Sequence, residues 1–237
     1  MNARIGMATM AISLWGAGLL VAPAAMAVEI DFNISAPTSG SIAYDGTPTG
    51  ALVGSNIGVS SVAGLSTPAN SNVAETCVSC VMNFSSGAFT SAGGANANNN
   101  GWWKFGSSGS ITITGGVTLP GGTDIPADSP LLTGSFINAT VQDLGLQGFK
   151  VTFGTFTDTK NDTLLSYFGL TPGTPFQGAL TLLFAAPDNG VGSAFTSTSV
   201  FSGNVVNAVV PVPAAALLFG SGLIGLAGAL RKKRSLA

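Results

Sequence analysis

The chain contains short runs in which apolar and polar residues alternate with a period of two. Successive residues of a β-strand point to opposite faces, so such a run predicts a strand with one buried and one solvated face. The apolar positions of these runs are Ile111 and Ile113; Ile137, Ala139 and Val141; Phe149, Val151 and Phe153; and Leu180, Leu182 and Phe184. Turn residues separate the runs, at 45–48, 120–122, 126–130, 171–173 and 187–190. This pattern predicts an all-β domain, an antiparallel β-sandwich or jelly-roll-like fold.

The run at Phe149 changes phase at Gly154. Phe153 and Phe156 lie three residues apart, and a regular strand would send them to opposite faces. A β-bulge centred on the glycine would return both aromatic side chains to the core. We therefore expect a bulge at Gly154.

One short helix is expected beyond this strand. Asp162 can cap it, Thr163–Phe168 can form one or two turns, and Gly169 can end it. So short a helix is marginal by itself, so its apolar side chains should dock it on the sheet. These side chains are Leu164, Leu165 and Phe168.

The first residues have the organisation of a secretory signal peptide. A short cationic start precedes the apolar, uncharged stretch Ile5–Val21. Ala25 and Ala27 then place small residues at the two positions that signal peptidase requires. We expect cleavage after Ala27, which makes residues 1–27 the signal peptide. A retained N-terminal membrane helix is the alternative, and Pro23 argues against it.

The last residues form a second apolar segment with a cationic end. Ala214–Leu230 comprises 17 residues without a charge. As a transmembrane helix it would be about 25 Å long, enough to cross a bilayer with help from its flanks. The basic stop that follows consists of Arg231, Lys232, Lys233 and Arg234. Four adjacent cations resist translocation, so residues 210–237 should anchor the chain in the inner membrane, with the C-terminus in the cytoplasm and the body outside.

The same tail resembles a known sorting signal. Its proline motif consists of Val210, Pro211, Val212, Pro213 and Ala214, and the block Phe219–Gly222 and the cations follow in order. This arrangement is similar to the PEP-CTERM signal, in particular to the variant headed by Val-Pro-Leu-Pro-Ala, although Val212 stands where the family name has Glu. The resemblance implies an exosortase substrate, cut near the proline motif by that membrane protease and passed to the cell surface. An ordinary single-pass anchor is the alternative.

The body expected to be exported, residues 28–209, is acidic. It contains three lysines against ten aspartates and glutamates, a net charge of −7, whereas the whole chain carries −2. Such a surface repels phosphate backbones, so no nucleic-acid partner is expected.

Cys77 and Cys80 are the only cysteines, and both lie in this body. In an oxidising compartment a single pair favours a local disulfide that closes a tight loop. Bridging requires the two Cα atoms to lie within about 7 Å, so the segment must turn. A redox centre and two free thiols are the alternatives. A closed zinc site is not expected, because the chain has no His and no other Cys.

The side chains that acid–base and nucleophilic enzymes use are scarce. Without His, a Ser-His-Asp or Cys-His arrangement is excluded. Paired carboxylates such as Asp124 and Asp128 are the arrangement that glycoside hydrolysis would need, but both lie in a Pro/Gly loop in which Asp is favoured for turns. Asp158, Asn161 and Asp162 offer oxygens to calcium, yet no EF-hand spacing is met and a turn with a helix cap explains them better. We therefore expect a non-enzyme with no cofactor and no metal.

Trp102 and Trp103 are the candidates for ligand contact. Adjacent strand residues point to opposite faces, so one ring can fill the core while the other is exposed. An exposed indole can stack on a sugar ring; the alternative is that both rings are covered.

These features together predict an exported structural or interaction protein of the cell surface or extracellular matrix. The family resemblance implies a link with exopolysaccharide production, biofilm or floc formation. The alternative is a lectin-like module that binds the exopolysaccharide itself, with Trp102 or Trp103 as the stacking residue.

Overall fold

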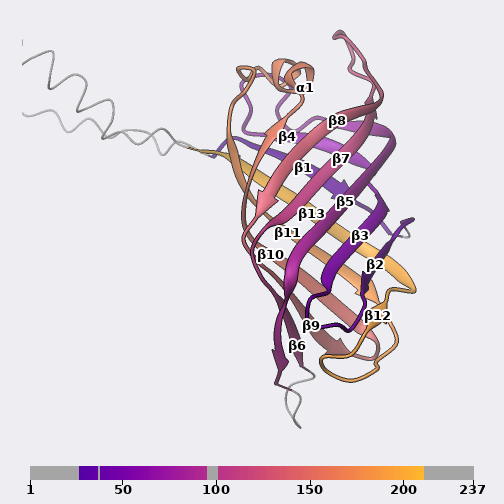
Figure 1. The fold of residues 1–237 in the computed structure, drawn as a ribbon. Helices are drawn as coiled ribbons and strands as arrows, with labels where there is room; N and C mark the ends of the chain where they lie inside the picture. Colours follow the sequence, from indigo (N-terminus) through magenta and orange to yellow (C-terminus); the bar gives the residue numbers. More distant parts are fainter. Residues whose placement is uncertain (1–26, 37, 95–100, 211–237) are drawn as a thin grey trace, which may run out of the picture.

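The computed structural model describes residues 27–36, 38–94 and 101–210 of the chain. Nearly all regular structure in this part is β, with one short helix (Figure 1). The elements are β1 (Glu29–Ile34), β2 (Ser41–Tyr44), β3 (Ala51–Gly58), β4 (Ser61–Leu65), β5 (Ala74–Gly93), β6 (Trp102–Phe105), β7 (Gly109–Val117), β8 (Ile125–Phe136), β9 (Ala139–Gly145), β10 (Gly148–Lys160), α1 (Asp162–Tyr167), β11 (Phe176–Ala185), β12 (Phe195–Thr196) and β13 (Ser199–Val209). The all-β prediction with one short helix is confirmed.

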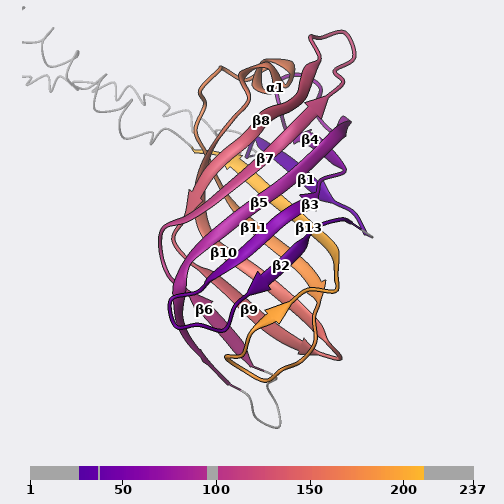
Figure 2. The same ribbon diagram turned by 45° about the vertical axis from the view of Figure 1, so that its right-hand side comes forward.

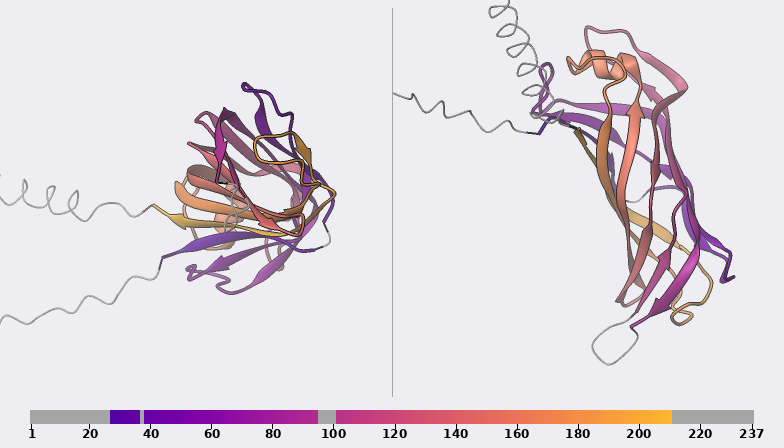
Figure 3. Two further views of the ribbon diagram at one scale, coloured as in Figure 1. Left: turned by 90° about the horizontal axis from the view of Figure 1, so that it is seen from below. Right: turned by 60° about the vertical axis from the view of Figure 1, so that its left-hand side comes forward.

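Hydrogen bonding joins the described strands in one antiparallel sheet that closes on itself. From β5 the pairing runs through β4, β1, β13, β11, β10, β8 and β7, and β7 pairs again with β5. Strand β5 has 20 residues, and it pairs along its length with β4, β7, β3 and β6 in turn. Seen from below, the strands surround the interior in which the core lies (Figure 3).

The buried side chains follow the predicted period of two. Phe149, Val151 and Phe153 are each at most 2% exposed, and the alternating residues of the Ile111 and Leu180 runs are buried as well. The pairing of β10 with β11 shifts register between Phe153 and Phe156, and Phe156 is 1% exposed. The bulge at Gly154 is therefore confirmed.

Two sequence predictions about strands and turns were wrong. Ile137 is 62% exposed, because it lies between β8 and β9 rather than in the strand that contains Ala139. The segment 126–130, predicted as a turn, belongs to β8 and pairs with β7. Only Leu132–Phe136 of β8 also pairs with β10, so the earlier part of the strand is an edge, and an edge tolerates proline.

Strands β6, β9 and β12 lie together at one end of the sheet (Figures 1 and 2). Seven aromatic side chains form a continuous cluster inside this end. The ring of Phe149 stacks on Phe184 at 5.4 Å and on Phe195 at 5.9 Å, and meets Trp103 edge-on at 5.9 Å between centroids. The members of this aromatic cluster are Tyr44, Phe89, Trp103, Phe105, Phe149, Phe184 and Phe195. It fixes the part of the core directly beneath β6, β9 and β10.

Helix α1 lies at the other end of the sheet, docked as predicted: Leu164, Leu165 and Phe168 are fully buried. Gly169, at φ 75°, ends the helix as expected. The cap is Asn161 rather than Asp162, since the Asn161 side chain accepts hydrogen bonds from the backbone N–H groups of the first turn. The Asp162 carboxylate instead accepts from the backbone N–H of Gly173, at 3.1 Å.

The two ends of the described body leave the sheet side by side. The backbone N–H of Val209 donates to the carbonyl of Val28 at 2.9 Å, and Glu29 pairs with Ala208. Both lie toward the end that carries α1 (Figure 1). The predicted signal peptide and sorting signal lie outside the described residues, except for Ala27 and Val210. Among the described residues, no helix has the length and hydropathy needed to cross a bilayer.

Candidate functional site

A groove of about 420 Å³ lies on the outer face of β6, β9 and β10. Its lining residues are Trp102, Lys104, Asn138, Thr140, Gln142, Lys150, Thr152, Phe153 and Gly154, and we call it the Trp102 groove. Strand register sets its geometry. Trp102, Gln142 and Lys150 stand opposite one another in one row, and Lys104, Thr140 and Thr152 form the next row. An indole, an amide, hydroxyls and two ammonium groups therefore share one outer face.

The sequence of β6 explains why Trp102 faces outward. In this strand Trp103 and Phe105 are buried, so the alternating residues Trp102 and Lys104 must point away from the core. The half-buried indole of Trp102 lies over Gly93 of the neighbouring β5, where an added Cβ would come within 3.3 Å of the ring. The Lys104 ammonium sits 4.5 Å from the centroid of the same ring, in cation–π contact.

Trp103 is not available for stacking on a ligand. It is 2% exposed, and its ring packs against Phe149 and Phe195 of the aromatic cluster. Its indole N–H donates to the Ser193 carbonyl at 3.3 Å, which satisfies the only polar atom of the ring. Of the two tryptophans proposed from the sequence, the structure thus leaves Trp102 alone in contact with the surface.

The bulge closes the groove at one end. The backbone N–H of Gly154 donates to the carbonyl of Asn138 at 3.0 Å. A Cβ at position 154 would lie 2.4 Å from Oδ1 of Asn138, so only glycine lets the asparagine amide approach the bulged strand this closely. The bulge that returns Phe156 to the core therefore also places an exposed amide at the edge of the groove.

Cys77 and Cys80 lie in β5, and the structure has both as thiols. The segment does turn: Ser79 has φ 55°, and the pairing with β7 shifts register between Val78 and Val81. A hydrogen bond between the two side chains lowers the pKa of Cys80 and raises that of Cys77. The thiols are thus adjacent, and the disulfide itself stays a prediction.

A buried ion pair lies inside the sheet, away from the groove. The Lys160 ammonium bonds Asp158 at 2.6 Å, with both side chains inaccessible, and sits 3.7 Å from the centroid of the Phe176 ring. Burial lowers the pKa of Lys160 to about 8 and raises the pKa of Asp158, and each partner only partly offsets the shift of the other. One oxygen of Asp158 has no hydrogen-bond partner among the described residues. The ion pair is therefore a structural feature of the core, and neither charged group is accessible to a ligand.

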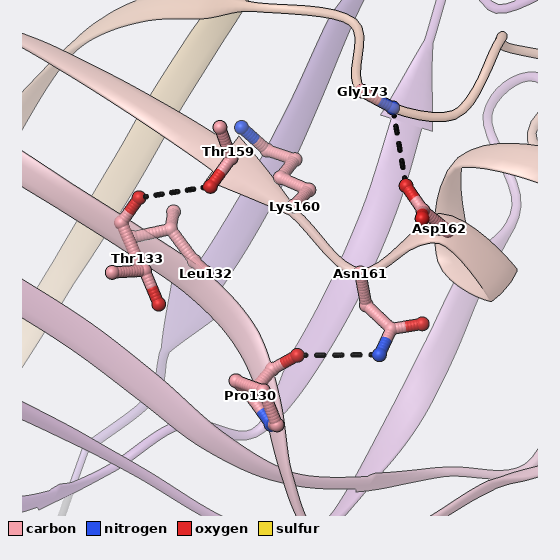
Figure 4. Close-up of a pocket in the computed structure, with 8 residues that line it drawn as sticks. All are labelled: Pro130, Leu132, Thr133, Thr159, Lys160, Asn161, Asp162 and Gly173. Carbon is pink, nitrogen blue, oxygen red and sulfur yellow. Dashed lines mark hydrogen bonds between the residues drawn. The ribbon is translucent and has the colours of Figure 1, made fainter.

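The oxygens suggested for calcium diverge from one another. A pocket of about 330 Å³ is lined by Asn161 and Asp162. The Asn161 Oδ1 accepts from the N–H groups of the first turn of α1 while its Nδ2 donates to the Pro130 carbonyl, and the Asp162 carboxylate accepts from the N–H of Gly173 (Figure 4). Asp158 belongs to the buried ion pair instead. In the described ranges, no three His, Cys, Asp or Glu side chains come together as metal ligands.

Asp124 and Asp128, the two carboxylates considered for glycoside hydrolysis, have separate roles in the structure. Asp124 accepts a hydrogen bond from the backbone N–H of Leu119 at 2.9 Å, which closes the turn before β8. Asp128 is exposed, with φ 65°. These are the turn roles that the loop composition suggests.

The comparisons with known proteins identify no relative of the chain. No family model matches the chain, and no curated protein and no solved structure matches it either. The resemblance of the tail to the PEP-CTERM signal stays a prediction.

Most groove residues could be predicted to face outward, but not to lie together. The alternation of β9 and β10 already placed Thr140, Gln142, Lys150 and Thr152 opposite the buried positions. What the sequence did not reveal is that β9 pairs with both β6 and β10, because two strands, β7 and β8, lie between β6 and β9 along the chain. The outward position of Trp102 was therefore the one feature of the sequence that pointed to a binding site on this face.

Proposed function

We propose that the chain is an exported surface or extracellular-matrix protein that contacts a polysaccharide through the Trp102 groove. The observation that supports this most is the mixed chemistry of the two rows. A sugar ring presents apolar C–H faces and a rim of hydroxyls. An indole offers an apolar face, and amides, hydroxyls and ammonium groups around it offer hydrogen bonds to the rim. Trp102, Gln142 and Thr140 supply these partners from adjacent strands.

The position of the groove agrees with a surface role. The ends of the body, at Val28 and Val209, lie toward α1, and the groove lies toward the opposite end of the sheet (Figure 1). If Val210–Ala237 holds the chain in the inner membrane before processing, the groove points away from that membrane. A ligand in the surrounding matrix could then reach it without hindrance from the anchor.

The remaining proposals concern catalysis, export, sorting and fold type, and they rest on the sequence. The chain is proposed to be a non-enzyme, exported with the help of signal peptidase and sorted by an exosortase-type protease. The body is proposed to be of the β-sandwich or jelly-roll type, with opposite walls of its one closed sheet in the place of two separate sheets. The absence of His supports the first of these points, the acidic body argues against a nucleic-acid partner, and the order of proline motif, apolar segment and basic cluster supports the sorting.

Mass spectrometry of the mature chain tests the export proposal. Protein recovered from the medium should begin at Val28 and end near Pro213, whereas protein recovered from membranes should retain Arg231–Arg234. Deleting these four cations should reduce membrane retention before processing, because they resist translocation. A cytosolic protein that retains both Met1 and Ala237 would contradict the proposal.

Removing the indole tests the groove. Trp102→Ala should weaken binding of the full chain to immobilised exopolysaccharide by about 30-fold, since truncating an aromatic anchor in a binding site typically costs about 2 kcal/mol. The matched control is Phe201→Ala, because Phe201 is also an exposed aromatic residue, 44% accessible, but lies on β13 outside the groove. Equal affinities of the two variants would contradict this assignment of the binding face.

A further inference from the structure

The positive charge of the body is concentrated at the Trp102 groove. In the described part of the chain the cationic side chains are three lysines, against ten acids. Lys160 is buried in its ion pair with Asp158, so it offers no charge to a ligand. The other two, Lys104 and Lys150, both line the groove. An otherwise acidic body thus presents its accessible cations on one face.

Among the described residues, no carboxylate forms an ion pair with Lys104 or Lys150. Apart from Lys104 and Lys150, the outward side chains of the described strands β6, β9, β10 and β11 are aromatic, amide, hydroxyl or aliphatic. The acids of these strands, Asp143 and Asp158, are buried on the opposite side. Elsewhere the net negative charge repels a polyanion, so this face is the place where an anionic chain can approach.

The two ammonium groups can approach one sugar unit from different strands, Lys104 from β6 and Lys150 from β10. Lys104 lies over the ring of Trp102, and Lys150 lies two strands away, about 10 Å at normal strand spacing. A neutral sugar that stacks on the indole must displace Lys104 from its cation–π contact without compensation. An acidic sugar offers the displaced ammonium a carboxylate, so the same displacement produces a charge-assisted hydrogen bond.

We propose that the Trp102 groove selects acidic saccharides, in which the ring stacks on Trp102 and carboxylate groups bind Lys104 and Lys150. This inference rests on the proposed saccharide-binding function and adds the chemical class of the ligand. Gln142, which stands between Trp102 and Lys150 in the same row, supplies an amide to the hydroxyls of the bound unit.

A matched pair of ligands tests the charge alone. The full chain in detergent micelles is titrated calorimetrically with an oligogalacturonate and with its methyl ester, which has the same ring and linkage but no charge. The acid should bind about tenfold more tightly than the ester, from two exposed charge contacts. This advantage should disappear in about 0.5 M NaCl, where exposed charges are screened beyond a few ångströms.

Two double variants assign the effect to the lysines. Lys104→Gln with Lys150→Gln should bind the acid about tenfold more weakly than the wild type, and should bind the ester at least as tightly, because no ammonium then has to leave the indole. Asn72→Asp with Gln177→Glu changes the net charge by the same amount at exposed positions outside the groove and should keep the preference for the acid.

The outcomes separate the two proposals. Equal affinity for acid and ester, with both lost in Trp102→Ala, would overturn the acidic ligand class and leave the saccharide site standing. No binding of either ligand would overturn both. A preference for the acid that survives Lys104→Gln with Lys150→Gln would also overturn the inference, because residues other than these lysines would then bind the carboxylates of the ligand.

Discussion

Phe149→Ala should lower the free energy of unfolding by about 3–5 kcal/mol, the range for removing a buried phenylalanine ring. Phe149 is 1% exposed and contacts Trp103, Phe184 and Phe195, so the closed sheet cannot collapse easily around the space that its ring leaves. Urea unfolding followed by tryptophan fluorescence measures the change.

Phe201→Ala is the matched control for this variant. Its ring is 44% accessible on the outer face of β13, so the loss should stay below about 1 kcal/mol. Phe149→Leu, which keeps most of the buried volume, should fall between the two. Similar losses for Phe149→Ala and Phe201→Ala would show that the aromatic cluster does not form the core described here.

Asp158→Asn should lower the free energy of unfolding by about 3–5 kcal/mol, as much as Phe149→Ala does. The substitution leaves the Lys160 ammonium buried without the carboxylate that it bonds. Replacing both members, with Asp158→Leu and Lys160→Met, removes the two desolvated charges together and should restore stability to that of the wild type or above it. Urea unfolding at neutral pH distinguishes these variants. If the double variant is as unstable as Asp158→Asn, the pair contributes more than its desolvation costs.

The same pair predicts a pH dependence. The folded chain releases the Lys160 proton near pH 8, whereas the unfolded chain retains it to near 10.5. Between these values the unfolded state binds more protons, so raising the pH favours the folded state, by about 2 kcal/mol between pH 8 and 9.5. The double variant lacks Lys160 and should not show this rise. A wild-type chain that loses stability relative to the double variant over this window would contradict the assignment.

The sequence predicted individual strands better than their neighbours. Alternation identified the buried faces of β7, β10 and β11 and the bulge at Gly154, because burial on one face imposes a period of two. It failed at 126–130, where pairing with β7 outweighs the local preference of proline and aspartate for turns.

Closure of the sheet was not predictable from local patterns. The contact of β5 with β7, and the place of β9 between β6 and β10, depend on pairings between segments distant in sequence, and side-chain alternation carries no information about partners. The groove could not be predicted for the same reason, because its two rows of residues come from three strands. Trp102 was found because tryptophan is rare and conspicuous, whereas Lys104 and Lys150 acquire a shared role only when β9 brings their strands to one face.

Nuclear magnetic resonance of the tryptophan indoles tests the binding face most directly. Trp15 belongs to the predicted signal peptide, so the ¹⁵N-labelled mature chain should give two indole N–H signals, which Trp102→Phe and Trp103→Phe assign. On titration with oligogalacturonate, the Trp102 signal should move and saturate, while the signal of Trp103, whose N–H is bonded to Ser193 inside the core, should stay in place. A saturable ligand that leaves the Trp102 signal unchanged would contradict the account.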